Sequence, residues 1–185
     1  GKRAMKYDEI LKIDESDKKI IELLQADPSI THSEIAEKIH KSQPAVGARI
    51  IKLKRKFLLT EQIGSEFNKL PIKFARIEIA ANHIEKIWPK FSKCPHIINC
   101  FKMTGEYNIM IEIVAPNVKS IERFVDDCLR KDKLISRIRT NFVIDSLRPY
   151  IIPLAFEVER MQDHGCSFEC GGPINKEDLE KLLST

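Results

Sequence analysis

The spacing of apolar residues changes near Ile72, and this change divides the chain into two kinds of structure. Before Ile72, apolar residues recur every three or four positions, which predicts short amphipathic helices. After it, Ala75, Ile77 and Ile79 alternate with polar or small residues, which predicts a half-buried strand. A chain of 185 residues has room for one or two domains. We therefore expect an α+β protein with a helical N-terminal part.

Three short helices are predicted in this N-terminal part, each with one apolar face. Asp14 is placed to cap the first helix, and Thr31 and Glu34 have the spacing of a capping box at the start of the second. The third helix follows a short turn at His40-Lys41. The next segment, Leu58–Leu70, has the pattern of strand, turn and strand. Together these elements predict a winged helix-turn-helix.

The third helix concentrates basic charge. Its segment, Lys41–Lys56, holds six basic residues and no acidic one, whereas the whole chain has a net charge of only +4. At ~100° per residue, an apolar stripe on this helix lies beside a cationic stripe of Arg49, Lys52 and Lys56. A short helix with one buried side and one cationic flank suits a DNA major groove. The alternative interpretation is a solvated charged face.

Four strands and two helices are predicted after this part, in the order βαββαβ. The strands cover residues 72–80, 97–103, 109–115 and 136–144, and the helices cover residues 84–91 and 118–131. This order predicts a ferredoxin-like domain with its helices on one face of an antiparallel sheet. We therefore divide the chain into residues 8–70, residues 71–156 and a tail, residues 157–185.

Four segments resemble the Lrp/AsnC (feast/famine) family of transcriptional regulators. They include IDESDKKIIELLQADPSITHSEIAEKI, SQPAVGARIIKL with Ser42, Val46, Arg49 and Leu53, and MTGEYNIMIEI, which is similar to a Gly-x-Tyr-Asp turn. The resemblance implies a DNA-binding half and a half that pairs sheets in a homodimer, often assembled into tetramers or octamers. It also implies near-palindromic operators in double-stranded DNA, and small effectors, usually amino acids, between subunits.

The sequence departs from the family pattern at three places. His40 lies in the turn before the recognition helix, where the family often has Gly. Lys56-Phe57 follows that helix, where the family again often has Gly. Asn108 replaces the commoner Asp of the Gly-x-Tyr-Asp turn, which removes a carboxylate near the expected effector pocket.

The recognition helix supplies the expected DNA contacts. Gln43 suits a bidentate contact with adenine, and Ala45 suits a thymine methyl group. Arg49 is the strongest candidate for a base or phosphate contact, and the lysines are expected to bind phosphates. The complete predicted set is Lys41, Ser42, Gln43, Pro44, Ala45, Arg49, Lys52 and Lys56.

The expected effector site is the turn Thr104, Gly105, Glu106, Tyr107 and Asn108. In the alternative interpretation, Gly105 supplies a positive φ and Tyr107 packs in a subunit interface.

Five cysteines in a scattered pattern argue against a secreted disulfide framework. In the tail, His164, Cys166 and Cys170 have a spacing that suits zinc, with a fourth ligand from another cysteine or a neighbouring subunit. A redox-active cysteine pair and an incidental pair are the two alternatives.

The sequence contains no apolar run long enough to span a membrane, and its N-terminus lacks the apolar core of a signal peptide. We therefore expect a cytoplasmic protein without a membrane partner. It is not expected to be an enzyme, because no nucleotide-binding glycine loop or nucleophile arrangement stands out. The rival function is a tetrapyrrole (sirohaem-type) decarboxylase of the same architecture, with His83, His96, Arg137 and Arg139 as its candidate residues.

Overall fold

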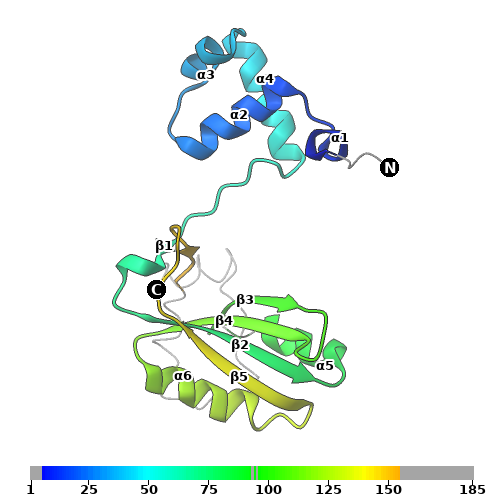
Figure 1. The fold of residues 1–185 in the computed structure, drawn as a ribbon, viewed down its shortest axis with the longest axis vertical. Coiled ribbons are helices and arrows are strands. Elements are labelled where there is room, and N and C mark those ends of the chain that lie inside the picture. Colours follow the sequence, from blue (N-terminus) through cyan, green and yellow to red (C-terminus); the bar gives the residue numbers. More distant parts are fainter. Residues whose placement is uncertain (1–5, 93, 95, 155–185) are drawn as a thin grey trace, which may run out of the picture. The chain divides into compact units, whose positions relative to one another are not determined.

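The structure is a computed structural model that describes residues 6–92, 94 and 96–154. The described residues form two compact units, one that ends at Gln62 and one that starts at Ile63 (Figure 1). The division lies before the boundary that the sequence suggested, inside the segment expected to form a wing. The predicted zinc or redox residues His164, Cys166 and Cys170 lie outside the described residues.

The N-terminal unit contains four helices, three of which surround an apolar core. They are α1 (Tyr7–Leu11), α2 (Glu15–Ala26), α3 (His32–Ile39) and α4 (Gln43–Arg55). Side chains from the last three meet in the core, and Ile20, Ile35, Val46 and Leu53 are fully buried. Asp14, Thr31 and Ser42 each accept a hydrogen bond at a helix N-terminus, as expected of caps. The predicted helix-turn-helix is confirmed, and α1 precedes it.

Left-handed residues end both helices of the helix-turn-helix. His40 has φ 54° after α3, and Phe57 has φ 58° after α4. After α4 the N–H of Leu58 donates to the carbonyl of Leu53, and the N–H of Phe57 donates to that of Lys54, both at 3.0 Å. These two bonds form a Schellman motif, which favours glycine at the left-handed position. The backbone is thus left-handed at both places where the family often has glycine.

Replacing Phe57 by glycine is expected to stabilise the N-terminal unit by about 0.5 kcal/mol. Left-handed backbone costs a residue with a Cβ about 1 kcal/mol, and the greater freedom of unfolded glycine cancels part of the gain. Phe57 is 85% exposed, so little packing is lost. Urea unfolding followed by circular dichroism measures the change. Phe57→Ala, which removes the ring but keeps the strain, is the control, and an equal gain in both variants would contradict the strain argument.

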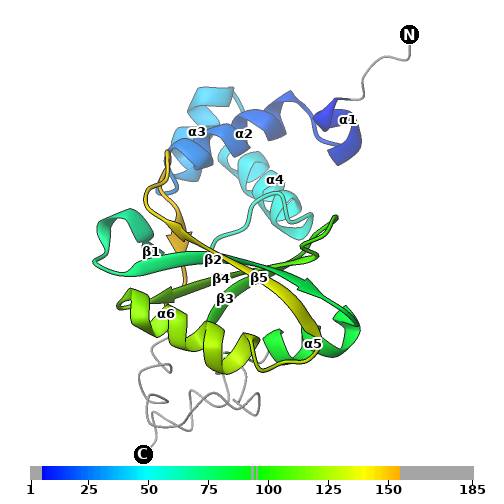
Figure 2. The ribbon, with the colours of Figure 1, turned by 60° about the horizontal axis from the view of Figure 1, so that its bottom comes forward.

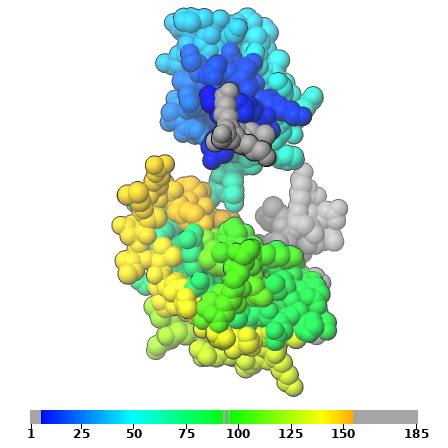
Figure 3. Space-filling model, turned by 45° about the vertical axis from the view of Figure 1, so that its right-hand side comes forward, coloured from blue at the N-terminus to red at the C-terminus, as the bar shows by residue number. Residues whose placement is uncertain are grey.

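The predicted wing is not formed. Within residues 56–70, all of which the structure describes, the only strand is β1 (Ser65–Glu66), and it pairs with β6 (Ile151–Ile152). Figure 3 shows the orange segment near residue 150 beside the blue-green segment that precedes β2. Leu58 and Leu59 pack on the core of the N-terminal unit instead. The segment is therefore divided between two cores, and it cannot fold back on itself as a hairpin.

The C-terminal unit has the predicted βαββαβ order. Its main elements are β2 (Lys73–Ala81), α5 (Ile84–Ser92), β3 (Ile97–Lys102), β4 (Ile109–Ala115), α6 (Val118–Phe124) and β5 (Ile135–Val143). The antiparallel sheet has the order β3-β4-β2-β5, and both helices cover the same face of it (Figures 1 and 2). A 3-10 turn, η1 (Phe67–Lys69), precedes β2, and a π-helical turn, η2 (Val125–Leu129), extends α6. The ferredoxin-like prediction is confirmed.

Alternation along the strands separates the two faces of the sheet. Ala75, Ile77 and Ile79 are fully buried under the helices, as predicted, with Ile109 and Ile111 from β4 beside them. The other residues of each strand face away from the helices. A second apolar cluster forms there, where the segments around β1 and β6 pack on the sheet.

A buried carboxylate lies on this second face. Glu112 of β4 is only 1% exposed. It accepts hydrogen bonds from Tyr150 at 2.9 Å and 3.0 Å and from Arg76 Nε at 2.9 Å. The ring of Tyr150 is stacked on that of Phe74 at a centroid distance of 5.6 Å. This network joins the segment before β6 to two central strands.

Candidate nucleic-acid interface

The predicted recognition helix is α4, and its position is fixed by one buried side. The buried seam of α4 consists of Val46, Ile50 and Leu53. Ser42 caps its N-terminus by accepting a hydrogen bond from the N–H of Ala45 at 3.3 Å. Pro44 lies in the first turn, where a helix needs no N–H donor from it. The cap engages the Ser42 hydroxyl, which was predicted to contact DNA.

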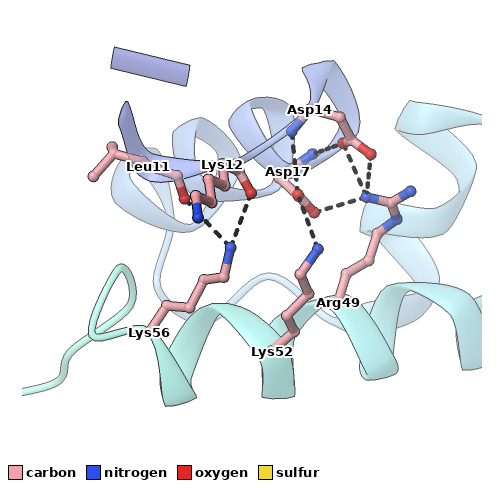
Figure 4. Close-up of polar contacts among 7 residues, drawn as sticks. All are labelled: Leu11, Lys12, Asp14, Asp17, Arg49, Lys52 and Lys56. Atoms are coloured by element: carbon pink, nitrogen blue, oxygen red, sulfur yellow. Dashed lines mark hydrogen bonds and ion pairs between the residues drawn. The ribbon is translucent and has the colours of Figure 1, made fainter. Parts of the chain in front are cut away.

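The cationic stripe of α4 is directed at α2 and α1, and not outward as the sequence suggested (Figure 4). Arg49 Nη1 donates to both carboxylate oxygens of Asp14, at 2.9 Å and 2.8 Å, and to Asp17 Oδ1 at 2.7 Å. Asp17 is 1% exposed and the Arg49 side chain is 28% exposed. Arg49 therefore neutralises a buried carboxylate at the start of α2.

The two lysines of the same stripe continue this contact. Lys52 Nζ lies 4.0 Å from Asp17 Oδ2 and remains largely exposed. Lys56 Nζ donates to the carbonyls of Leu11 at 3.3 Å and Lys12 at 2.9 Å, at the C-terminus of α1 (Figure 4). An ammonium group at a helix C-terminus satisfies carbonyls that lack partners within the helix. Lys52 thus stays accessible to a phosphate, whereas Lys56 holds α1 against α4.

Asp14 and Asp17 form a reciprocal cap at the start of α2. The N–H of Asp17 donates to Asp14 at 2.8 Å, and the N–H of Asp14 donates to Asp17 at 3.3 Å. The backbone N–H of Asp17 and the Arg49 guanidinium hold the pKa of the Asp14 carboxyl below its usual value. The same two carboxylates raise the pKa of Arg49. One cation therefore ties the middle of α4 to the N-terminus of α2.

A different side of α4 faces outward. It lies opposite the buried seam and starts at the turn before the helix. The exposed residues on it are Lys41, Pro44, Ala48, Ile51 and Arg55, whereas Gln43 is exposed at the first residue of the helix, nearer the seam. Ala45 is half-buried. The sequence analysis missed Ala48, Ile51 and Arg55, although an angle of ~180° from the seam at 100° per residue identifies them.

Two family models match the chain. The model of the AsnC-type helix-turn-helix domain matches residues 13–54, and that of the Lrp/AsnC ligand binding domain matches residues 73–150. The chain belongs to the Lrp/AsnC family of transcriptional regulators. The family inferred from the sequence motifs is thereby confirmed, and α4 is the second helix of the family's helix-turn-helix.

Named regulators are similar to this Lrp/AsnC chain over most of their length. Transcriptional regulator AzlB of Bacillus subtilis is 28% identical over 142 residues, which cover 72% of this chain and 90% of AzlB. Regulator LysM of Saccharolobus solfataricus is 29% identical over 120 residues, which cover 62% of this chain and 82% of LysM.

Solved structures share the fold of this Lrp/AsnC chain. Escherichia coli AsnC superposes with a TM-score of 0.64 at 18% identity, over 76% of this chain and 97% of AsnC. A transcriptional regulator from Neisseria meningitidis, solved as a complex with L-Met, has a TM-score of 0.63 at 20% identity. That match covers 74% of this chain and 92% of the regulator.

The Asn108 side chain holds the Gly-x-Tyr-Asn turn of the Lrp/AsnC domain to the backbone of strand β2. Asn108 accepts a hydrogen bond from the N–H of Ala81 at 2.9 Å and donates one to its carbonyl at 2.8 Å. An aspartate could make only the first bond, because a carboxylate has no N–H. Gly105 has φ 99°, so it supplies the positive φ of the turn. Asn108 therefore has a structural role that the family's commoner aspartate could not fill completely.

Glu106 and Tyr107 of the turn lie beside strand β5. Glu106 pairs with Arg137, and the Arg139 guanidinium lies 4.5 Å from the centre of the Tyr107 ring. Thr104, Gly105 and Glu106 are exposed, whereas Tyr107 and Asn108 are half-buried. The turn thus places a carboxylate beside two guanidinium groups of the edge strand β5.

The four residues considered for a tetrapyrrole site do not converge. His83 is hydrogen-bonded to a glutamate in the first turn of α5, and the ring of His96 packs 5.6 Å from that of Phe124. Arg137 and Arg139 each pair with a different glutamate. Within the described part of the chain, His, Cys, Asp and Glu form no group of three or more that could bind a metal ion. None of the described helices is long and apolar enough to cross a membrane.

Proposed function

We propose that this chain regulates transcription from the cytoplasm by binding operator DNA as a homodimer, with one α4 in each half-site. The observation that carries the proposal is the outward side of α4, which is exposed along its whole length and has a cation at each end, Lys41 and Arg55. A helix-turn-helix inserts its second helix into the major groove, and its N-terminal residues contact base edges. The matched AsnC-type helix-turn-helix model supports the same use of α4.

The contacts of α4 suggest a role for each predicted residue. Lys41, Lys52 and Arg55 bind phosphates, which position the helix. Gln43, exposed at the first residue of α4, reads adenine. Arg49, which the sequence suggested as a DNA contact, instead positions the helix through Asp14 and Asp17. The ends of the helix are placed by the Ser42 cap, by Pro44 in the first turn and by the contact of Lys56 with α1. Ala45 is half-buried.

Removing a phosphate contact is expected to weaken binding to every DNA sequence by a similar factor. Each of Lys41→Ala and Lys52→Ala should raise the Kd for a selected operator and reduce the slope of log K against log salt by about 1, because one fewer counterion is released. Fluorescence anisotropy at four or more salt concentrations measures both quantities. Arg49→Lys keeps the positive charge at residue 49, so it should leave the slope unchanged.

Lys19→Ala is the matched control, because Lys19 is an exposed lysine of α2, outside α4. It makes the same charge change and should leave affinity and slope nearly unaltered. Equal salt slopes in the wild-type protein, Lys41→Ala and Lys52→Ala would contradict the assignment of α4 as the DNA-binding helix. Absence of any sequence preference in the wild-type protein would contradict the proposed function itself.

The Lrp/AsnC domain is the proposed effector and assembly module. Its dimers, alone or assembled into tetramers or octamers, would bring the two α4 helices to a near-palindromic site. The regulator crystallised with L-Met supports an amino acid as the class of effector. The turn from Thr104 to Asn108 is the proposed contact, because Arg137 and Arg139 can pair with an α-carboxylate and Glu106 with an α-ammonium group.

Titration calorimetry with the twenty amino acids tests this effector site. We expect heat from at least one of them and at least a tenfold weaker association after Arg137→Ala, because the α-carboxylate loses its partner. Arg130→Ala, which removes an exposed arginine paired only within its own helical segment, is the control. A panel without heat from any amino acid would exclude this class of effector.

A further inference from the structure

The outward side of α4 carries an apolar stripe in its centre. Pro44, Ala48 and Ile51 follow one another at spacings of four and three residues, so they project from the same side of the helix. This side is opposite the buried seam, and Ile51 is 54% exposed. Between the end cations Lys41 and Arg55, the centre of the outward side is therefore apolar.

Gly47 is a second unusual feature of the same helix. Glycine inside a helix is destabilising relative to alanine, so its presence usually has a local reason. Packing gives none here, because an added Cβ would lie 3.6 Å from Nδ1 of His32, an ordinary contact distance. Gly47 lies beside the outward stripe and Ala48 lies within it. Neither residue has a bulky side chain. A helix of this kind allows its backbone to approach another surface closely.

The floor of the major groove fits such a stripe. Among the four bases, thymine alone presents a methyl group there, and apolar side chains such as alanine contact it. Apolar groups neither donate nor accept hydrogen bonds, so they distinguish base pairs only by shape and by the presence of this methyl group. The cations at the two ends of the stripe are placed for the phosphates that flank the groove.

We propose that Ala48 and Ile51 determine operator specificity by contacting thymine methyl groups, so that the half-site carries A·T pairs under the middle of α4. The proposal rests on the proposed function of α4. With a rise of 1.5 Å per residue, the two side chains are about 4.5 Å apart along the helix axis. Successive base pairs are about 3.4 Å apart along the DNA axis. The two thymines therefore lie on adjacent base pairs or are separated by one base pair.

Removal of single methyl groups from the DNA tests this proposal. Selection from random oligonucleotides first defines the sites that the full-length protein prefers. Each thymine of a selected half-site is then replaced by deoxyuridine, which lacks only the methyl group. We expect at least one replacement to weaken wild-type binding about fourfold, the value of one buried methylene-sized group. Ile51→Ala should bind the unmodified site more weakly and should lose the response to that replacement.

Ile10→Ala is the matched control, because Ile10 is exposed to a similar extent but belongs to α1. It should keep the wild-type response to deoxyuridine. Selected sites without thymines in the half-site, or an unchanged deoxyuridine response in Ile51→Ala, would overturn the inference and leave DNA binding by α4 intact. Failure to select any preferred sequence would instead overturn the proposed function.

Discussion

Arg49→Met is expected to lower the free energy of unfolding of the N-terminal unit by about 3 kcal/mol. Methionine keeps the apolar stem of the side chain but leaves the carboxylate of Asp17, which is 1% exposed, without its cation. Removal of one partner from a buried ion pair costs about 3–5 kcal/mol. The lower end applies here, because the Arg49 side chain is partly exposed and Lys52 lies 4.0 Å from Asp17. DNA binding is then lost through the position of α4, not through a missing contact.

Two optical signals locate this effect. Trp88, the single tryptophan of the sequence, belongs to α5 in the C-terminal unit. Its fluorescence reports on that unit, whereas far-ultraviolet circular dichroism reports on both. Arg49→Met should therefore shift the circular dichroism transition in urea and leave the fluorescence transition in place. The variant Lys54→Met, which breaks the exposed pair of Lys54 with Glu61, should shift neither.

A double-mutant cycle with Asp17→Asn separates the ion pair from other effects of the substitution. Once residue 17 is neutral, loss of Arg49 should cost about 1–2 kcal/mol less, because the two residues interact directly. Strictly additive effects would show that the stability lost in Arg49→Met does not come from the ion pair with Asp17. Wild-type stability of Arg49→Met, combined with weaker DNA binding, would return Arg49 to the set of DNA contacts.

Glu112→Ala is expected to lower the free energy of unfolding of the C-terminal unit by about 2 kcal/mol. The Tyr150 hydroxyl loses its acceptor in a half-buried site, and Arg76 loses the carboxylate that neutralises it. An unsatisfied buried polar group costs about 1–3 kcal/mol. Burial and the hydrogen bond to Glu112 raise the pKa of Tyr150, so the phenol remains a donor well above neutral pH. Glu112→Gln, which keeps an acceptor for this phenol, should lose less.

Trp88 fluorescence in urea measures the effect of both Glu112 substitutions. Glu78→Ala is the control on the same face of the sheet, because Glu78 also bonds an arginine but is more exposed than Glu112. Its substitution should cost less than 1 kcal/mol, as for other pairs near the surface. A loss in Glu78→Ala as large as that in Glu112→Ala would show that burial of the carboxylate does not determine its contribution.

Local signals in the sequence were sufficient for most elements of the fold. Caps such as Asp14 and Thr31, and the alternation around Ile77, act through the nearest few residues, so their effect is visible in the sequence. The wing was predicted wrongly for the opposite reason. Ser65–Glu66 has a distant partner, Ile151–Ile152, and nothing in the local pattern reveals a pairing over that separation.

The sequence by itself determined the family, the order of the elements and the presence of a cationic flank on α4. Tertiary structure decided where that flank is directed. The angle between two stripes on one helix follows from 3.6 residues per turn, but the neighbour that each stripe meets depends on how helices pack. Asp17 lies 32 residues before Arg49 in the sequence, and only packing of α2 against α4 brings their charges within 2.7 Å. The same packing leaves Ala48 and Ile51 on the accessible side of the helix.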